Sequence, residues 1–291
     1  CSHCHLSLGT HAYREGSCLM QHFRNTLRHL LLIFVCFISL YPVWFMLSTA
    51  LKSQNYYVLN PMGLPYHPTL ANFGSVLTNW PLLVWVRNSL VATVVSVLVS
   101  TIISIMAAFA IVFSRARGRE TLFRVNIALM AIPSVALLIP MYMLMIKFHL
   151  INQLPSAILF YIGLLIPFSI FFLVNFFREI PIELVEAAYM DGAPHHRILR
   201  SIILPISGAS TVTLIIVNAI FVWNELLVAL VFLQSNSART LMAGLTLYQG
   251  RYLSNEPLLM AAAFMSIMPL GILYVFGQRF FVRGLTAGMG K

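Results

Sequence analysis

Six long apolar stretches constrain this chain more than any other feature of its sequence. They cover roughly residues 30–51, 86–113, 125–147, 155–177, 207–232 and 258–280. A helix needs about 20 apolar residues to cross a bilayer core about 30 Å thick, and each stretch meets that length. Because only 9% of the residues are charged and 59% are hydrophobic, against roughly 25% charged in soluble domains, the composition excludes an ordinary water-soluble enzyme. We therefore expect an all-α membrane protein with six transmembrane helices.

The positive charges indicate how the chain crosses the membrane, because positive loops stay on the cytoplasmic side. If the N-terminus is cytoplasmic, most of the 18 Lys and Arg residues fall inside. The inside residues are Arg14, Arg24, Arg28, Arg115, Arg117, Arg119, Arg124, Arg178, Arg197, Arg200, Arg279, Arg283 and Lys291, and the outside residues are Lys52, Arg87, Lys147, Arg239 and Arg251. We expect both termini to be cytoplasmic. Nucleic-acid binding is not indicated by the net charge of +10, because these residues punctuate apolar runs and form no clustered basic face.

Three segments follow from this pattern: a cytoplasmic N-terminal leader (1–29), a six-helix transmembrane domain (30–280) and a cytoplasmic C-terminal tail (281–291). The leader contains cysteines and histidines that invite a zinc site, but the second half of a paired-ligand motif is missing. These residues are Cys1, Cys4, Cys18, His3, His5 and His11. We expect a disordered leader with reduced cysteines and no metal.

Acidic residues are too few for several membrane activities. Asp191 is the sole Asp and the Glu residues are scattered, so no carboxylate cluster is available for magnesium-dependent chemistry. Glu225 is the one acidic residue inside an expected span, which leaves a secondary transporter or channel as an alternative. The tail lacks a complete phosphate-binding loop. We therefore expect no catalytic residue and no cofactor on this chain.

Polar residues concentrate in the loop between spans four and five, residues 178–206. Pro181 suits the first position of a short helix, and Glu186 lies in the half where the helix dipole favours negative charge. Gly192 suits the left-handed residue that closes a helix. Pro194 then begins a second short helix.

Three parts of this loop match a known family in residue type and spacing: Glu186-Ala187-Ala188, Asp191-Gly192-Ala193 and Ile202-Ile203-Leu204-Pro205. They resemble the Glu-Ala-Ala loop of the permease subunits of ATP-binding-cassette (ABC) importers. Further segments are similar to the carbohydrate branch, and specifically to its maltose-type second permease: Arg87-Asn88-Ser89, Trp223-Asn224-Glu225 and residues 281–288. The resemblance extends from about residue 28 to the end. The sequence departs from it at Leu199, where the family often has an aromatic residue, and at Ala209, where it often has Pro.

The resemblance implies a transport subunit and no enzyme activity of its own. In such importers, two homologous permeases form the pathway for a sugar or oligosaccharide across the bacterial inner membrane. Two ATPase subunits bind ATP and Mg²⁺, and a periplasmic or extracellular binding protein delivers the sugar. The loop between spans four and five is then a coupling helix seated on an ATPase, and the residues that would carry the coupling are Glu186, Ala187, Ala188, Asp191 and Gly192. The tail resembles the start of one that reaches between the ATPases, although it would serve equally as a charged anchor for the last span.

Residues of the pathway are the least constrained by the sequence. Polar side chains within spans usually face the interior of a bundle, which makes candidates of Asn88, Asn218, Asn224 and Glu225. Hydrogen bonds between helices would explain all four equally well. The last external loop, 233–257, resembles the loop that contacts the binding protein, and its candidate contacts are Tyr248, Gln249, Arg251 and Tyr252.

Overall fold

A computed structural model describes residues 8–114, 116–248 and 255–287, and every regular element in these ranges is helical. The helices are α1 (Leu8–Ala50), α2 (Gln54–Leu59), α3 (Ala71–Asn79), α4 (Leu82–Phe113), α5 (Arg119–Met130), α6 (Ser134–Lys147), α7 (Leu154–Arg178), α8 (Ile182–Met190), α9 (His195–Ile198), α10 (Leu204–Ile206), α11 (Gly208–Asn224), α12 (Leu227–Phe232), α13 (Leu241–Leu245) and α14 (Glu256–Ala287). A π-helical turn, Leu199–Ile203, links α9 to α10, and a 3₁₀ turn, Thr246–Tyr248, follows α13. The expected all-α class is confirmed. Helix α1 begins inside the segment expected to be a disordered leader, which is therefore helical from Leu8.

Three described helices are long and apolar enough to cross a membrane without interruption: residues 25–50 of α1, α4 and α7. Two more candidate spans are bent pairs. Helix α5 meets α6 at 95°, and the segment 195–206 meets α11 at 80°. Helix α14 is continuous over the expected span 258–280, and a shorter apolar stretch, 256–269, lies within it. The chain is thus a multi-pass membrane protein, but its described residues do not form six continuous spans.

The expected span 125–147 is wrong as a single helix because Pro133 interrupts it. Pro133 has no backbone N–H and disfavours helical geometry in the residue before it. Its own backbone is extended, with φ −66° and ψ 133°, and α6 restarts at Ser134. The expected span 207–232 is interrupted as well, because α11 ends at Asn224 and Glu225 is extended, with φ −71° and ψ 125°.

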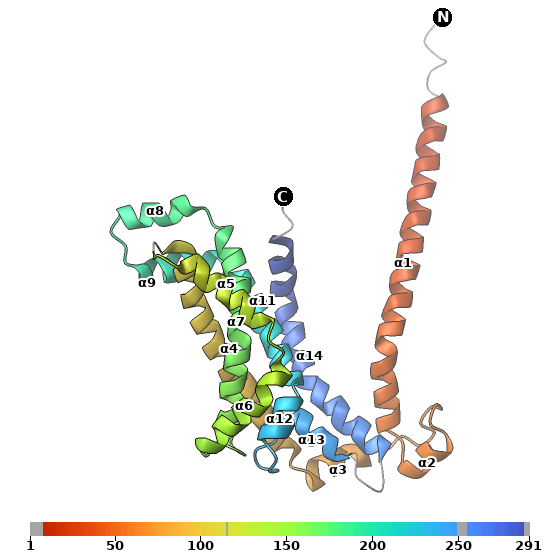
Figure 1. The fold of residues 1–291 in the computed structure, drawn as a ribbon. Coiled ribbons are helices and arrows are strands. Elements are labelled where there is room, and N and C mark those ends of the chain that lie inside the picture. Colours follow the sequence, from red (N-terminus) through yellow and green to blue (C-terminus); the bar gives the residue numbers. More distant parts are fainter. Residues whose placement is uncertain (1–7, 115, 249–254, 288–291) are drawn as a thin grey trace, which may run out of the picture.

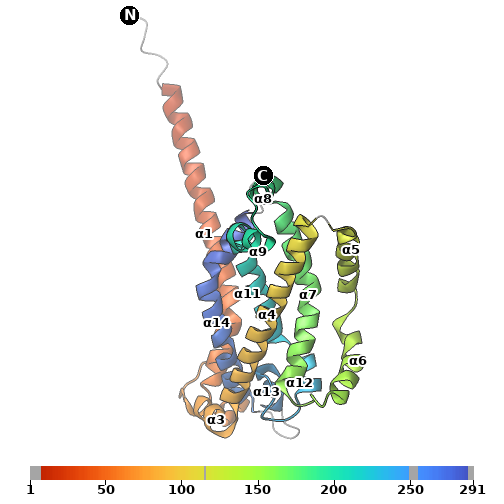
Figure 2. The same ribbon diagram turned by 90° about the vertical axis from the view of Figure 1, so that its left-hand side faces the viewer.

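The centre of the molecule is the contact between α4 and α7, which lie side by side in both views (Figures 1 and 2). One face of α4 carries small residues at helical spacing, and Ser96, Ser100, Ser104 and Ala108 are all fully buried. Small side chains let two helix backbones approach closely where lipid provides no hydrophobic driving force. This face therefore explains why α4 and α7 form the rigid core.

Helix α1 stands away from this core and meets it at one end only (Figure 1). Its residues 25–44 are exposed, and burial begins in its last turns, where it packs against α14. Apolar side chains such as Leu31 and Phe37 are 60% and 73% exposed. Residues 25–44 of α1 are thus left uncovered by the rest of the chain that the structure describes.

Lys52 fixes the loop that follows α1. Its side chain is 1% exposed, and its Nζ donates to the carbonyl oxygens of Pro61 (2.7 Å) and Asn60 (3.3 Å). Asn72 Nδ2 donates to the carbonyl oxygens of Ala50 and Lys52, both at 2.7 Å. Burial lowers the pKa of Lys52. These bonds hold α2 and α3 against the end of α1.

Candidate coupling site and transport pathway

Helix α8 is a short exposed helix at the end of the molecule where α4 and α7 finish (Figures 1 and 2). It starts after Pro181 and ends at Met190, and the chain then turns at Gly192 with φ +74°. The N–H of Gly192 donates to the Tyr189 carbonyl, and the N–H of Ala193 donates to the Ala188 carbonyl, both at 3.0 Å. This is the left-handed helix ending that the sequence predicts.

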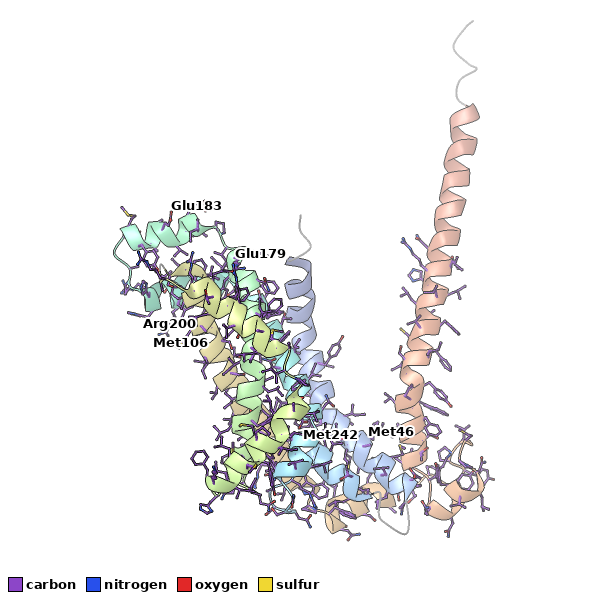
Figure 3. The ribbon with its side chains drawn as sticks, viewed as in Figure 1. Met46, Met106, Glu179, Glu183, Arg200 and Met242 are labelled. Carbon is purple, nitrogen blue, oxygen red and sulfur yellow. The ribbon has the colours of Figure 1, made fainter. Side chains whose placement is uncertain are left out.

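One side of α8 packs on this chain and the other is free. Val185 is fully buried and Ala188 is 8% exposed, and both lie in a cluster with Phe177 and Ile198. Ala188 therefore holds α8 in place, while Ala187 points outward. The exposed side chains of the free face are Ile182, Glu183, Leu184, Glu186, Ala187 and Met190. Glu183 is seen on the outer side of α8 in Figure 3. An apolar surface with two carboxylates at the tip of the molecule is suited to docking a partner.

Aromatic contacts connect this loop to the core helices. His195 lies edge-on to Tyr189 (centroids 5.4 Å apart) and to Phe109 of α4 (6.4 Å). Phe113 at the end of α4 contacts Phe177 near the end of α7, at 6.3 Å. The loop that carries α8 is thus in contact with α4 through His195, and the ends of α4 and α7 are in contact with each other. The sequence motif gave no sign of these aromatic partners, because they come from distant parts of the chain.

Glu225, the candidate for a carrier mechanism, lies in the break between α11 and α12. Its Oε2 accepts a hydrogen bond from Tyr161 Oη of α7 at 2.9 Å. Both carboxylate oxygens accept from the backbone N–H of Val228, at 3.1 and 3.0 Å. The side chain thus caps the start of α12 and ties it to α7. A structural role accounts for this acidic residue.

Asn218 and Asn224 also have partners within the chain. Asn218 is 1% exposed, and its Nδ2 donates to Ser169 Oγ of α7 at 2.9 Å. Asn224 is exposed and donates to the carbonyl of Ile220 in its own helix, at 2.8 Å. Another amide, Asn126 of α5, donates to the Pro167 carbonyl of α7 at 2.9 Å. Polar side chains therefore join α7 to α5 and α11 at several depths.

Asn88 holds the segment between α12 and α13. It is fully buried, and its Nδ2 donates to the carbonyls of Ser237 (2.8 Å) and Arg239 (2.9 Å). Trp85 Nε1 donates to the Asn236 carbonyl at 3.0 Å, and Ser89 Oγ accepts from the N–H of Leu241 at 2.8 Å. The first turns of α4 therefore clamp a segment about 150 residues away. The resemblance singled out Asn88 and Ser89 without revealing this role.

Aromatic rings complete the clamp. Tyr248 is 4% exposed, and its ring lies against that of Trp80, tilted by 35° with centroids 4.5 Å apart. Burial raises the pKa of Tyr248 to about 12. Its ring faces inward, so the surface of the segment is supplied by exposed residues such as Gln234 and Asn236. The other three candidate contacts, Gln249, Arg251 and Tyr252, lie outside the described residues, as do Cys1, Cys4, His3 and His5 of the leader.

Comparisons with known proteins agree with this geometry. Residues 100–287 match the family model described as "Binding-protein-dependent transport system inner membrane component". A putative ABC transporter permease protein, ORF2, of Caldicellulosiruptor sp. (strain Rt8B.4) is 39% identical over 253 residues, which cover 86% of this chain and 91% of that protein. The arabinooligosaccharides transport system permease protein AraQ of Halalkalibacterium halodurans is 32% identical over 259 residues, covering 88% and 92%.

A solved structure shares the fold. It is the crystal structure of a bacterial ABC transporter involved in the import of the acidic polysaccharide alginate, one chain of which matches with a TM-score of 0.74 and 24% sequence identity. The match covers 90% of this chain and 98% of that one. The fold of this chain is thus also found in one chain of a bacterial ABC transporter.

Proposed function

Because this chain belongs to the family of binding-protein-dependent transport system inner membrane components, we propose that it is the permease subunit of an ABC importer for a sugar or oligosaccharide. The proposal of a sugar draws on relatives such as the arabinooligosaccharide permease and the melibiose/raffinose/stachyose import permease MelC of Bacillus subtilis. The observation that carries the transport role is the free face of α8, which is mounted directly on the ends of the two core helices. A transport subunit whose energy comes from ATP hydrolysis in a partner subunit needs an exposed surface to which that partner can bind.

Coupling to ATP hydrolysis would take place at α8. Glu186 and Ala187 are exposed on the free face and available to an ATPase subunit, whereas Val185 and Ala188 hold the helix on its own chain. Asp191 and Gly192 form the turn that returns the chain to α9. Two ATPase subunits would supply the ATP and Mg²⁺ sites.

A second, homologous permease would complete the pathway. The Nδ2 groups of Asn88 and Asn218 and the carboxylate of Glu225 bond to partners within this chain. Asn88 Oδ1 has no hydrogen-bond partner among the described residues, but it is buried, so these side chains supply few free groups to a passing sugar. The uncovered apolar length of α1 also needs lipid or a second membrane subunit around it. This chain therefore forms one half of the pathway.

The residues at the two ends of the molecule support one orientation in the membrane. Helix α8 shares its end with the arginine-rich connection between α4 and α5, so we place that end, and both termini, in the cytoplasm. The opposite end carries the clamped segment 233–248, where exposed Gln234 and Asn236 would face the external binding protein. ATP-driven closure of the ATPases would then rock the two permeases between outward- and inward-open states.

The deciding experiment is purification of this chain from detergent-solubilised native membranes, followed by identification of co-purifying subunits and a vanadate-sensitive ATPase assay. We expect a second permease and an ATPase to co-purify, with ATP hydrolysis stimulated by the sugar-loaded binding protein. A chain that purifies alone and without ATPase activity, when an unrelated membrane complex survives the same detergent, would overturn the proposal.

A further inference from the structure

A groove lies between α4 and α5 near the end of the molecule that carries α8, and it has a volume of about 410 Å³. Its α4 wall includes Ala107 and Ala110, and its α5 wall includes Leu122, Val125 and Leu129. On each helix these residues recur at intervals of three or four, so they share one face. The α4 wall is made mostly of small residues, with Ile111 the one larger side chain among those that line the groove from α4.

Helix α5 contacts both α4 and α7, and its contacts with α7 are the more extensive. Asn126 donates to the Pro167 carbonyl of α7, and the ring of Phe123 stacks parallel to that of Phe171, with centroids 6.4 Å apart. Arg178 at the end of α7 pairs with Glu120 at 2.9 Å and covers the Phe123 ring at 4.7 Å. These contacts fix α5 on α7, and the groove toward α4 is left unfilled by the residues that the structure describes.

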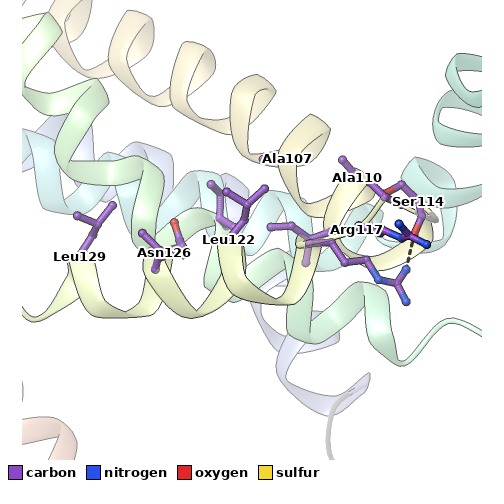
Figure 4. A pocket seen from close by; sticks show the side chains of 12 residues that line it. Ala107, Ala110, Ser114, Arg117, Leu122, Asn126 and Leu129 are labelled. Carbon is purple, nitrogen blue, oxygen red and sulfur yellow. Dashed lines mark hydrogen bonds between the residues drawn. The ribbon is translucent and has the colours of Figure 1, made fainter.

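The groove has a charged end and an apolar end (Figure 4). Arg117 lies at the charged end and Leu129 at the other. Arg119, the first residue of α5, also lines the groove. Arg119 Nη1 donates to the carbonyls of Val112 (3.0 Å) and Ser114, which fixes its guanidinium at the end of α4. Arg117 is exposed, and no carboxylate pairs with either arginine among the residues that the structure describes. The nearby Glu120 is used by Arg178.

We propose that this groove binds an anionic phospholipid, with its phosphate on Arg117 and Arg119 and one acyl chain between α4 and α5. Guanidinium groups bind phosphate oxygens in a fork geometry, and basic pockets between transmembrane helices suit anionic headgroups. A soluble anion would leave the apolar walls without a partner. An apolar helix of another subunit would bury two positive charges without compensation, which is costly.

A lipid at this position touches the part of α4 on which the coupling loop rests. Ala107, Ala110 and Phe109 belong to the same two turns of α4, and Phe109 contacts His195. Filling the groove therefore fixes the spacing of α4 and α5 just where motion of α8 enters the core. This inference does not depend on the identity of the transported sugar or on ATPase partners.

The test is native mass spectrometry of the full chain, delipidated in detergent and titrated with phosphatidylglycerol or phosphatidylcholine. We expect phosphatidylglycerol to be retained about tenfold better, a difference of about 1.4 kcal/mol. Arg117→Gln removes a headgroup contact and Ala110→Leu fills the apolar groove, and each should abolish most of that preference. Arg124→Gln and Ala128→Leu change exposed α5 residues that do not line the groove, and both should bind lipid like the parent chain.

Thermal unfolding of each variant shows that it is folded before its lipid binding is compared. Equal loss of phosphatidylglycerol in Arg124→Gln would mean that general surface charge attracts the lipid, and would overturn the proposal. Unchanged retention in Ala110→Leu, or displacement of the lipid by an equal concentration of soluble glycerol phosphate, would also overturn it, because the acyl chain would then lie elsewhere.

Discussion

At Gly192 the main chain takes a φ of +74°, and a Cβ built there would meet no atom within 4 Å. Backbone strain alone therefore selects glycine at this position. Gly192→Val should cost about 1–3 kcal/mol and tilt α8, and so reduce sugar-stimulated ATP hydrolysis by the assembled importer. Gly192→Asn is the matched control, since Asn tolerates positive φ. Full activity in the valine variant, or equal loss in both, would contradict the assigned turn.

Gly244 is constrained by space and not by backbone conformation. A Cβ at this position would lie 2.2 Å from Cε3 of Trp85, so Gly244→Ala must displace the indole that donates to Asn236. Overpacking of this kind typically costs about 1–3 kcal/mol. We expect a lower Tm and altered tryptophan fluorescence. Gly163→Ala, at a site with nothing within 4 Å, serves as the control, and identical behaviour of the two variants would disprove the clamp.

The sequence could predict Gly192 but not the role of Asn88, and the reason is the range of the interactions. A helix ending is decided within a few residues, so Met190, Asp191 and Gly192 are enough to predict it. The amide of Asn88 bonds to carbonyls about 150 positions later, and a polar residue in a span looks the same whether it faces sugar or another helix. The inward orientation of Tyr248 was unpredictable for the same reason.

The transmembrane spans expected from the sequence did not include the helix breaks at Pro133 and Glu225. Residues 125–147 are predominantly apolar, and a hydropathy average over them does not reveal the 95° bend between α5 and α6 at Pro133. The proline itself was a local signal that could have been used. The break at Glu225 has no proline or glycine to mark it in the sequence. It is stabilised by a hydrogen bond from Tyr161 of another helix, so the local sequence does not reveal it.

The Glu225 break yields a prediction that separates a structural carboxylate from a proton-coupling one. Glu225→Gln keeps an oxygen that can accept from Tyr161 or from the N–H of Val228, whereas Glu225→Leu loses both bonds. Unpaired buried polar groups cost about 1–3 kcal/mol each, so the leucine variant should unfold at a clearly lower temperature than the glutamine variant. Transport by Glu225→Gln should keep the pH dependence of the parent. A shifted or abolished pH dependence would revive the secondary-transporter alternative.

Docking of the whole molecule on an ATPase can be tested through charge on the free face of α8. Glu186→Lys reverses an exposed charge there, and surface substitutions usually change stability by less than about 0.5 kcal/mol. We expect an unchanged Tm but recovery of the ATPase in pull-downs lower by about tenfold, or about 1.4 kcal/mol. Glu179→Lys makes the same change at an exposed residue just outside α8 and should retain the ATPase. Equal losses would mean that net charge, and not this face, governs docking.

Hydrogen bonds from α7 to its neighbours occur at Tyr161, Pro167 and Ser169, and Arg178 adds an ion pair at its end. Because these attachments are spread along its length, α7 cannot slide or rotate without α5, α11 and α12 moving with it. A displacement of α8 would thus move α7 together with the helices bonded to it, as far as the opposite end of the molecule. The conformational change needed for transport would then take place mainly between subunits, and not within this bundle.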